Sequence, residues 1–458
     1  MSSTSQIGLS RKQRVFIALE SVAGTLAWPS ATGDFVRPAG NAMINQNPAF
    51  VDSEELSNTL DLLDQFQNAV PAGDWEVPMY VRPSGTVGNK PQGMDAFYSL
   101  MGAENAATTA SLSGGISASA ATAVVDGIAG GTLPNVGVIT IGTEQIRYEG
   151  ITQAGSTAAT LLNCTRGYGS AAATAHLDNV DVALSSVFYK QAITAPSLTI
   201  WVETDHFIQA LTGATVNRAV FGVTNEGALK VTLTGQGMNM YWAGTSPLAA
   251  SAGTAATQLV VDDGKLFKAG MVIYNKTQSL TNAGSGWTIN TVSTNTLSLS
   301  AACGQTWATD DEVAGYLPTG TAIGDPIENR YTTVKVNGVE SRLKSMELTL
   351  DLPKKYIEDE IGAEYPEDYI EDRRNISSTM SLYFRKTDAK YFKDGYDGSE
   401  VPVHIRFGND DGYTMEMYLK RCILEVPAIN FAPPAVELTI PFKALGTVGE
   451  DSCEIVFH

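Results

Sequence analysis

Cysteine, histidine and basic side chains are scarce in this 458-residue sequence. The four cysteines stand far apart without a CxxC pair, and the four histidines show neither an HExxH pattern nor paired spacing. The sequence therefore predicts no disulfide framework, no metal site and no cofactor. Lys and Arg number 30 against 49 Asp and Glu, which gives a net charge of −19. Gripping phosphate groups requires clustered Lys and Arg, so this balance argues against a protein that holds DNA directly.

Long apolar runs and catalytic motifs are missing too. No segment reaches 18 consecutive apolar residues, and residues 1–14 lack the apolar core of a signal peptide. We therefore expect neither a membrane-spanning segment nor export by a signal peptide. The sequence contains no Gly-x-Ser-x-Gly elbow, no Walker A loop and no dinucleotide fingerprint. It predicts no catalytic residues and a protein that is not an enzyme.

Small residues and short apolar stretches make up most of what is present. Gly contributes 43 residues and charged residues only 17%, a composition that predicts a mainly β fold with many turns. One short helix is expected at 95–102, where Asp95 would cap the first turn and Gly102 would end the helix. The clearest expected strands are 15–19, 75–81, 187–189, 197–202, 228–233, 332–336, 345–350, 379–384, 401–407, 413–419 and 436–440.

Two segments differ from the rest of the chain. Residues 105–186 and 246–317 are rich in Ala, Gly, Ser and Thr and carry few charges. Each contains Val-Val-Asp, then a strand that starts with Gly, then a Leu-rich strand. This order predicts two small inserted β domains, although short low-complexity β sequences also resemble each other by chance. The remaining ranges, 1–104, 187–245 and 318–458, read as one β domain with a net charge of −14.

The order of elements outside these two segments resembles that of the tail tube (major tail) proteins of long-tailed bacteriophages. A strand, Ile17-Ala18-Leu19-Glu20, leads into an arm of small residues, and the helix closes on Gly102-Ala103-Glu104. Residues 197–235 are similar to the family's strand, turn and Leu-Thr-Gly region. The C-terminal third matches best, because residues 367–374 resemble an inter-strand loop and residues 437–446 precede a final acidic strand.

The first low-charge segment carries a resemblance of its own. Its residues Asn163-Cys164-Thr165-Arg166-Gly167-Tyr168-Gly169, followed by Ala175-His176, resemble a small β module that recurs in phage particle proteins.

The resemblance implies a tail-tube-like β-sandwich or barrel core with a flanking short helix and the two inserted β domains on the outside. It also implies a structural virion protein, made in the host bacterial cytoplasm, whose copies close into rings, with six the expected number. Stacked rings would form the tail tube, contact other tail proteins and conduct double-stranded DNA without binding it specifically. The alternatives are another phage tail component, such as a tail tip or decoration protein, and a secreted carbohydrate-binding or adhesive β protein.

The strongest charge feature is the stretch 351–374, which holds nine acidic and four basic side chains. A catalytic pair of carboxyl groups requires two different environments, so that one group has a higher pKa than the other. Consecutive acids exposed to solvent do not provide such a difference. The stretch is either a solvated loop or a loop that contacts a neighbouring subunit, with apolar residues at near-helical spacing. The candidate inter-subunit contacts are Tyr356, Ile357, Tyr365, Tyr369, Ile370, Arg373 and Arg374.

Overall fold

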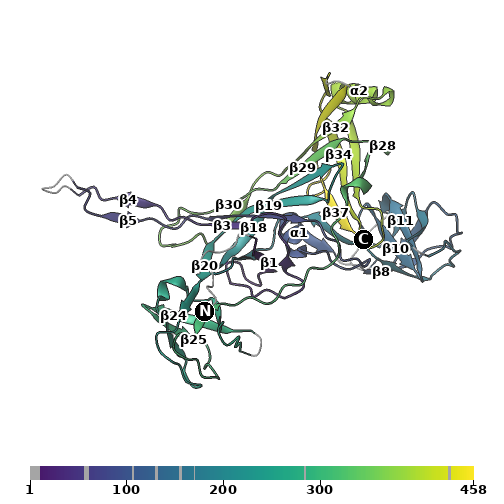
Figure 1. Cartoon of the computed structure of the whole chain (residues 1–458). Helices are drawn as coiled ribbons and strands as arrows, with labels where there is room; N and C mark the ends of the chain where they lie inside the picture. The colour runs from purple at the N-terminus through teal and green to yellow at the C-terminus, as the bar shows by residue number, and fades with distance from the viewer. Residues whose placement is uncertain are drawn as a thin grey trace.

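The computed structural model describes residues 11–55, 61–105, 108–128, 133–153, 157–169, 171–282, 285–431 and 435–458. Strands hold 47% of the residues and helices 6%, so the predicted mainly β fold is confirmed. All eleven expected strands are present, with ends shifted by a few residues. In Figure 1 a central body of strands carries a long hairpin on one side, a tower of strands above it, and two smaller groups of strands.

One long bent strand, β18 (Ile208–Thr224), connects the two halves of the central body. Its first half pairs with β17 and β20, and its second half pairs with β19 and β29. A register shift near Val216 and Arg218 marks the bend. The strands around its first half are β1 (Arg14–Leu19), β2 (Phe35–Val36), β17 (Leu198–Glu203) and β20 (Asn239–Ala243).

A second group of strands continues from the other half of β18 in the order β3, β6, β19, β18, β29, β32, β36. Apolar and polar residues alternate along β29 and β32, so one face of these strands enters the core. The bounds are β3 (Met43–Asn45), β6 (Gly73–Tyr80), β19 (Lys230–Gly237), β29 (Ser345–Asp351), β32 (Asn375–Tyr383) and β36 (Glu437–Ala444).

The last long strand, β34 (Met415–Leu424), closes the network by pairing with β33, β36 and β37. Strand β37 pairs with β16, which pairs with β7, and β33 pairs with the β27–β28 hairpin. The bounds are β7 (Gly102–Asn105), β16 (Val187–Gln191), β27 (Thr333–Val336), β28 (Val339–Ser341), β33 (Glu400–Phe407), β35 (Ala428–Asn430) and β37 (Glu454–Phe457).

Helix α1 (Met94–Met101) lies where the sequence places it and packs Phe97, Leu100 and Met101 into the main core. Gly102 ends it in the left-handed conformation, with φ at 91°. The predicted cap is wrong: Gly93 occupies the N-cap without a side-chain hydrogen bond, and Asp95 is a buried residue of the first turn. The N-cap lies two residues earlier than expected, which places Asp95 inside the first turn with its side chain buried.

The first low-charge segment forms an eight-stranded sheet with an apolar cluster drawn only from its own residues. In Figure 1 it lies beside the central body, on the side of the C-terminus. Its strands are β8 (Thr108–Leu112), β9 (Ala123–Asp126), β10 (Val136–Ile141), β11 (Glu144–Glu149), β12 (Ile151–Gln153), β13 (Ala159–Leu161), β14 (Thr165–Tyr168) and β15 (Asp181–Leu184).

The second segment forms a six-stranded sheet whose apolar cluster also includes Phe16, Trp201 and Ile208 of the central body. Its strands are β21 (Thr245–Pro247), β22 (Gln258–Val260), β23 (Val272–Asn275), β24 (Trp287–Ser293), β25 (Thr296–Leu299) and β26 (Glu312–Gly315), with a 3-10 turn at Gly264–Leu266.

The two smaller sheets pair their strands in the same pattern. The Val-Val-Asp strand pairs with the Leu-rich strand in each, as β9 with β13 and as β22 with β25. The Gly-led strand pairs with the last strand of each segment, as β10 with β15 and as β23 with β26. The first strand of each also pairs with the last, as β8 with β15 and as β21 with β26.

Two hairpins and a tower project from the central body. The first hairpin is formed by β4 (Phe50–Asp52) and β5 (Gln65–Gln67), the second by β30 (Lys354–Tyr356) and β31 (Tyr369–Glu371). Helix α2 (Lys390–Asp397) follows a 3-10 turn at Lys386–Ala389 and lies at the top of the tower in Figure 1. A further 3-10 turn spans Asn329–Tyr331. Within the described residues, no helix has the length and apolarity needed to cross a bilayer.

Candidate assembly site

The predicted contact loop is the turn of the β30–β31 hairpin. Its stem pairs Lys354 with Glu371 and Tyr356 with Tyr369, and residues 357–368 form the connection. The near-helical spacing of its apolar residues does not correspond to a helix. The stem residues pair across the hairpin instead, and this pairing satisfies their backbone hydrogen-bonding groups. The two strands are separated in the sequence, so the spacing of apolar residues does not reveal the pairing.

Tyr356 and Tyr369 fasten this hairpin to its own chain. Tyr356 is only 3% exposed, and its hydroxyl donates to the carbonyl of Gly213 at 2.6 Å. The hydroxyl of Tyr369 donates to the carbonyl of Ala195 at 2.6 Å, and the two rings lie 5.4 Å apart between centroids. Burial raises the pKa of Tyr356 and raises that of Tyr369 to about 12. Both phenols therefore act as neutral donors near pH 7, and Tyr356 is enclosed within its own chain.

Tyr365 anchors the connection to the six-stranded sheet. The Lys268 ammonium group lies 5.1 Å from the centroid of the Tyr365 ring, 4.8 Å from that of Tyr241 and 5.1 Å from that of Trp242. It also donates to the carbonyl of Met240 at 2.6 Å. A cation among three aromatic faces is a favourable arrangement when it is partly desolvated. The sequence analysis missed Lys268, because 97 positions separate it from Tyr365.

The remaining candidates divide into exposed and tethered residues. Ile370 is 62% exposed, Arg373 is exposed and Ile357 is half-buried. Arg374 donates to Glu371 at 2.8 Å and also hydrogen-bonds the carbonyl of Ala192. Ile370 and Arg373 are thus the predicted contacts that a second molecule would reach most easily.

A buried lysine lies beneath the hairpin. The Lys354 ammonium group donates to the carbonyl of Val216 at 2.8 Å, and the residue is 4% exposed. Burial lowers its pKa to about 8, with Glu371 acting in the opposite direction. This lysine clamps β30 against β18 and is not placed to contact another molecule.

Beside this hairpin projects the β4–β5 hairpin, hereafter the arm, which the sequence analysis did not single out. The arm comprises the described residues of 48–68 and extends away from the body in Figure 1. Phe50, Val51, Leu62, Leu63 and Phe66 are each 50–57% exposed. A two-stranded hairpin is marginally stable in water by itself. Apolar side chains so placed are typical of a surface that another molecule covers.

The base of the arm meets the contact loop. The backbone N–H of Val70 donates to the carbonyl of Glu364 at 2.9 Å, and that of Ala72 donates to the Glu358 carboxylate at 2.8 Å. Two segments separated by nearly 300 positions are therefore placed side by side, and the apolar arm continues the surface that carries the acidic loop.

A buried charge cluster joins the eight-stranded sheet to the central body. Glu416 on β34 is fully buried, and its carboxylate accepts from Arg147 of β11 at 2.7 Å. His404 Nε2 lies 2.6 Å and His458 Nε2 2.9 Å from the same carboxylate. Burial opposes its charge, but Arg147 and the two histidines hold the pKa of Glu416 well below its usual range. Arg147 also contacts Glu149 at 2.5 Å.

The motif Asn163–Gly169 and His176 contribute to a second buried cluster. Glu144 of β11 is 1% exposed and accepts two hydrogen bonds from the Arg166 guanidinium, at 2.8 and 2.9 Å. His176 Nε2 lies 2.7 Å from this carboxylate, and the Thr174 N–H donates to it at 3.0 Å. Burial raises the pKa of Glu144, but these partners together lower it to about 2. Arg166 and His176 of the motif therefore hold β14 and its following loop to β11.

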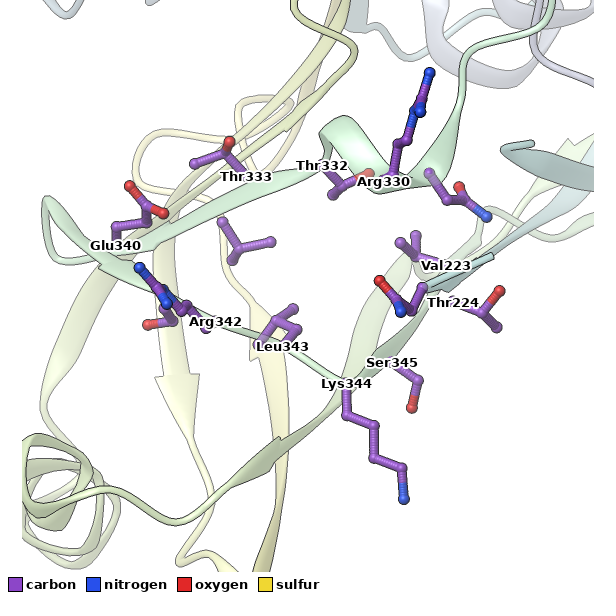
Figure 2. Close-up of a pocket in the computed structure, with 14 residues that line it drawn as sticks. Val223, Thr224, Arg330, Thr332, Thr333, Glu340, Arg342, Leu343, Lys344 and Ser345 are labelled. Carbon is purple, nitrogen blue, oxygen red and sulfur yellow. The ribbon is translucent and has the colours of Figure 1, made fainter. Parts of the chain in front are cut away.

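The cavities offer little that would bind a small molecule. A cavity of about 300 Å³ lies between the ends of β18 and β29 and the β27–β28 hairpin. Figure 2 shows that the labelled cations Arg330 and Lys344 point in opposite directions instead of converging. No histidine or cysteine is among its described lining residues. In the part of the chain that the structure describes, no three His, Cys, Asp or Glu side chains are grouped to hold a metal ion.

Comparisons with known proteins give no assignment. No protein family model matches the chain, and no curated protein is significantly similar to it.

Proposed function

We propose that this chain is a structural virion subunit that assembles into stacked rings and forms the tail tube of a long-tailed phage, the conduit for double-stranded DNA. The central strands with helix α1 would be the sandwich or barrel core of the subunit. Residues 105–186 and 246–317 would be two copies of an inserted β module on the outside of the tube. The equivalent pairing of their strands supports this duplication.

The observation that carries self-assembly is the arm. It exposes five large apolar side chains on a hairpin that has little core of its own. Folding leaves this surface partly in water. Because each of these side chains is already about half buried, covering it with a partner would gain roughly half of the ~1.5–3 kcal/mol that full burial provides. Since the arm's base also meets the acidic loop, the arm and the loop form one continuous surface that a neighbouring copy would cover.

The net charge supports the choice of a conduit over a DNA-binding protein. The charge of −19 would repel phosphate groups that pass through the bore instead of retaining them.

Negative-stain microscopy of the purified chain tests the proposal. We expect hollow filaments or rings from the wild-type chain, and folded monomers from the Phe50→Ser/Phe66→Ser variant. A control, Leu177→Ser/Val448→Ser, removes two apolar side chains elsewhere that are even more exposed, and it should assemble normally. A wild-type chain that remains monomeric over all concentrations would contradict the proposal, and discrete particles without a bore would indicate another tail component.

A further inference from the structure

The top of the tower carries a group of four cations. Arg385, Lys386, Lys390 and Lys393 fall within nine residues, on the 3-10 turn and the first turn of α2. Among the described residues, none of these four forms an ion pair with a carboxylate. The acids nearest in sequence are Asp388, which is buried and accepts from the Arg385 N–H at 2.8 Å, and Asp394 and Asp397 at the end of α2.

Exposed apolar side chains lie on α2 and on the segments next to it. Phe384 is 41% exposed, Tyr396 85% and Val426 53%. Phe384 packs against Phe392 of α2 at 6.2 Å between ring centroids, and Gly395 lies directly against the backbone of Val426. These residues and the four cations constitute what we call the tip. The tip therefore combines exposed apolar side chains with four cations, and the acids Asp397 and Glu425 are exposed beside it.

The arm has the opposite charge and a similar apolar content. Residues 48–68 hold five acidic side chains, Asp52, Glu54, Glu55, Asp61 and Asp64, and no basic one. Glu54 and Glu55 are exposed. In Figure 1 the arm and the tip lie at different extremities of the molecule, the arm to one side and α2 at the top.

We propose that the tip is the docking surface for the arm of a second copy of this chain, an inference that rests on the proposed self-assembly. Apolar side chains of the arm would cover Phe384, Tyr396 and Val426. Glu54 and Glu55 would face the cations of the tip. The apolar contact supplies most of the affinity, and the charges determine how the two surfaces align. The charges also prevent two arms from binding each other, because both arms are negatively charged.

This contact is heterologous, because the arm and the tip are different surfaces. After one contact forms, one copy still has a free tip and the other still has a free arm, so the same contact repeats. Repetition produces a closed ring or an open filament, whereas a self-complementary contact would stop at a dimer. The inferred contact therefore accounts for growth beyond two copies.

Charge reversal tests the inference on the full chain. The variants are Lys386→Glu/Lys393→Glu on the tip, Glu54→Lys/Glu55→Lys on the arm, and all four changes together. We expect each pair of changes to raise the critical concentration for assembly at least tenfold, and the four changes together to restore it. The control, Lys230→Glu/Lys265→Glu, makes the same charge change on exposed lysines elsewhere and should leave the critical concentration unchanged.

The outcomes separate this inference from the proposed function. If the wild type assembles and the tip variant assembles equally well, the inference is wrong while self-assembly stands. If the tip variant fails but the four changes together do not restore assembly, the tip contacts a partner other than the arm, and the inference is again wrong. If the wild type never assembles, both the inference and the proposed function fail.

Discussion

Arg147 of β11 and Glu416 of β34 form a buried ion pair at 2.7 Å, although 269 positions separate them in the sequence. The pair lies where the eight-stranded sheet meets the central body, and the arginine also contacts Glu149. Removing either residue would leave the other buried without its main counter-charge, which is costly for a charge removed from water.

Replacing Arg147 with Met should therefore lower the free energy of unfolding by about 3–5 kcal/mol, since it leaves the Glu416 carboxylate buried without its main partner. Urea unfolding measures the loss. The double variant Arg147→Met/Glu416→Met should recover a large part of it. Arg421→Met, which breaks an exposed pair with Glu400, is the control and should barely shift the midpoint. A loss in the double variant equal to the sum of the losses in Arg147→Met and Glu416→Met would show that the pair is not coupled.

Glu144 should make the chain sensitive to acid. Its folded pKa of about 2 lies below the unfolded value of 4.5, so its contribution is fully present above pH 4.5 and is lost as the pH falls toward 2. The difference corresponds to about 3 kcal/mol. Acid unfolding of the wild type and of Glu144→Gln measures it. The variant should be less stable at pH 7 and should lose less stability between pH 4.5 and 2; parallel pH profiles would contradict the assignment.

Asp95 should act in the opposite sense. Burial, together with Asp34 and Glu104, raises its folded pKa to about 6 from 3.8. The folded state therefore binds its proton more tightly, and stability declines as the pH rises from 3.8 to 6 and stays reduced above. Asp95→Asn should raise the free energy of unfolding by about 1–3 kcal/mol at pH 7.5 and by little below pH 4. A gain that does not depend on pH would point to better packing instead of a removed charge.

The contact loop should act on assembly more than on folding. Tyr365→Ser/Tyr369→Ser removes the ring against Lys268 and the hydrogen bond to Ala195, so the hairpin loses its fixed position. We expect a folded, soluble monomer by circular dichroism and sedimentation that fails to elongate. Arg373→Ala changes an exposed charge and should mainly alter the salt dependence of assembly. Normal polymerisation of the double tyrosine variant would show that the loop is not an assembly element.

Local patterns gave much of the secondary structure from the sequence alone. Alternating apolar residues predicted β29 and β32, because burial on one face of a strand produces that pattern within a few residues. Gly102 predicted the end of α1, because glycine readily adopts the left-handed conformation found there. The Val-Val-Asp and Leu-rich strands, whose order recurs in the sequence, pair with each other in both smaller sheets.

The tertiary structure decided what those elements meet. The near-helical spacing between Tyr356 and Ile370 arose in a hairpin whose stem pairs Tyr356 with Tyr369, and no local rule indicated that Lys268 would lie against Tyr365. The sequence did not predict the arm either, because its apolar residues do not differ in type from core residues. Only the fold shows that they are exposed to water. The spacing of apolar residues indicates which face of a single segment is buried. The pairing of Arg147 with Glu416 and the exposure of Phe66 depend instead on which distant segments the fold brings together or keeps apart.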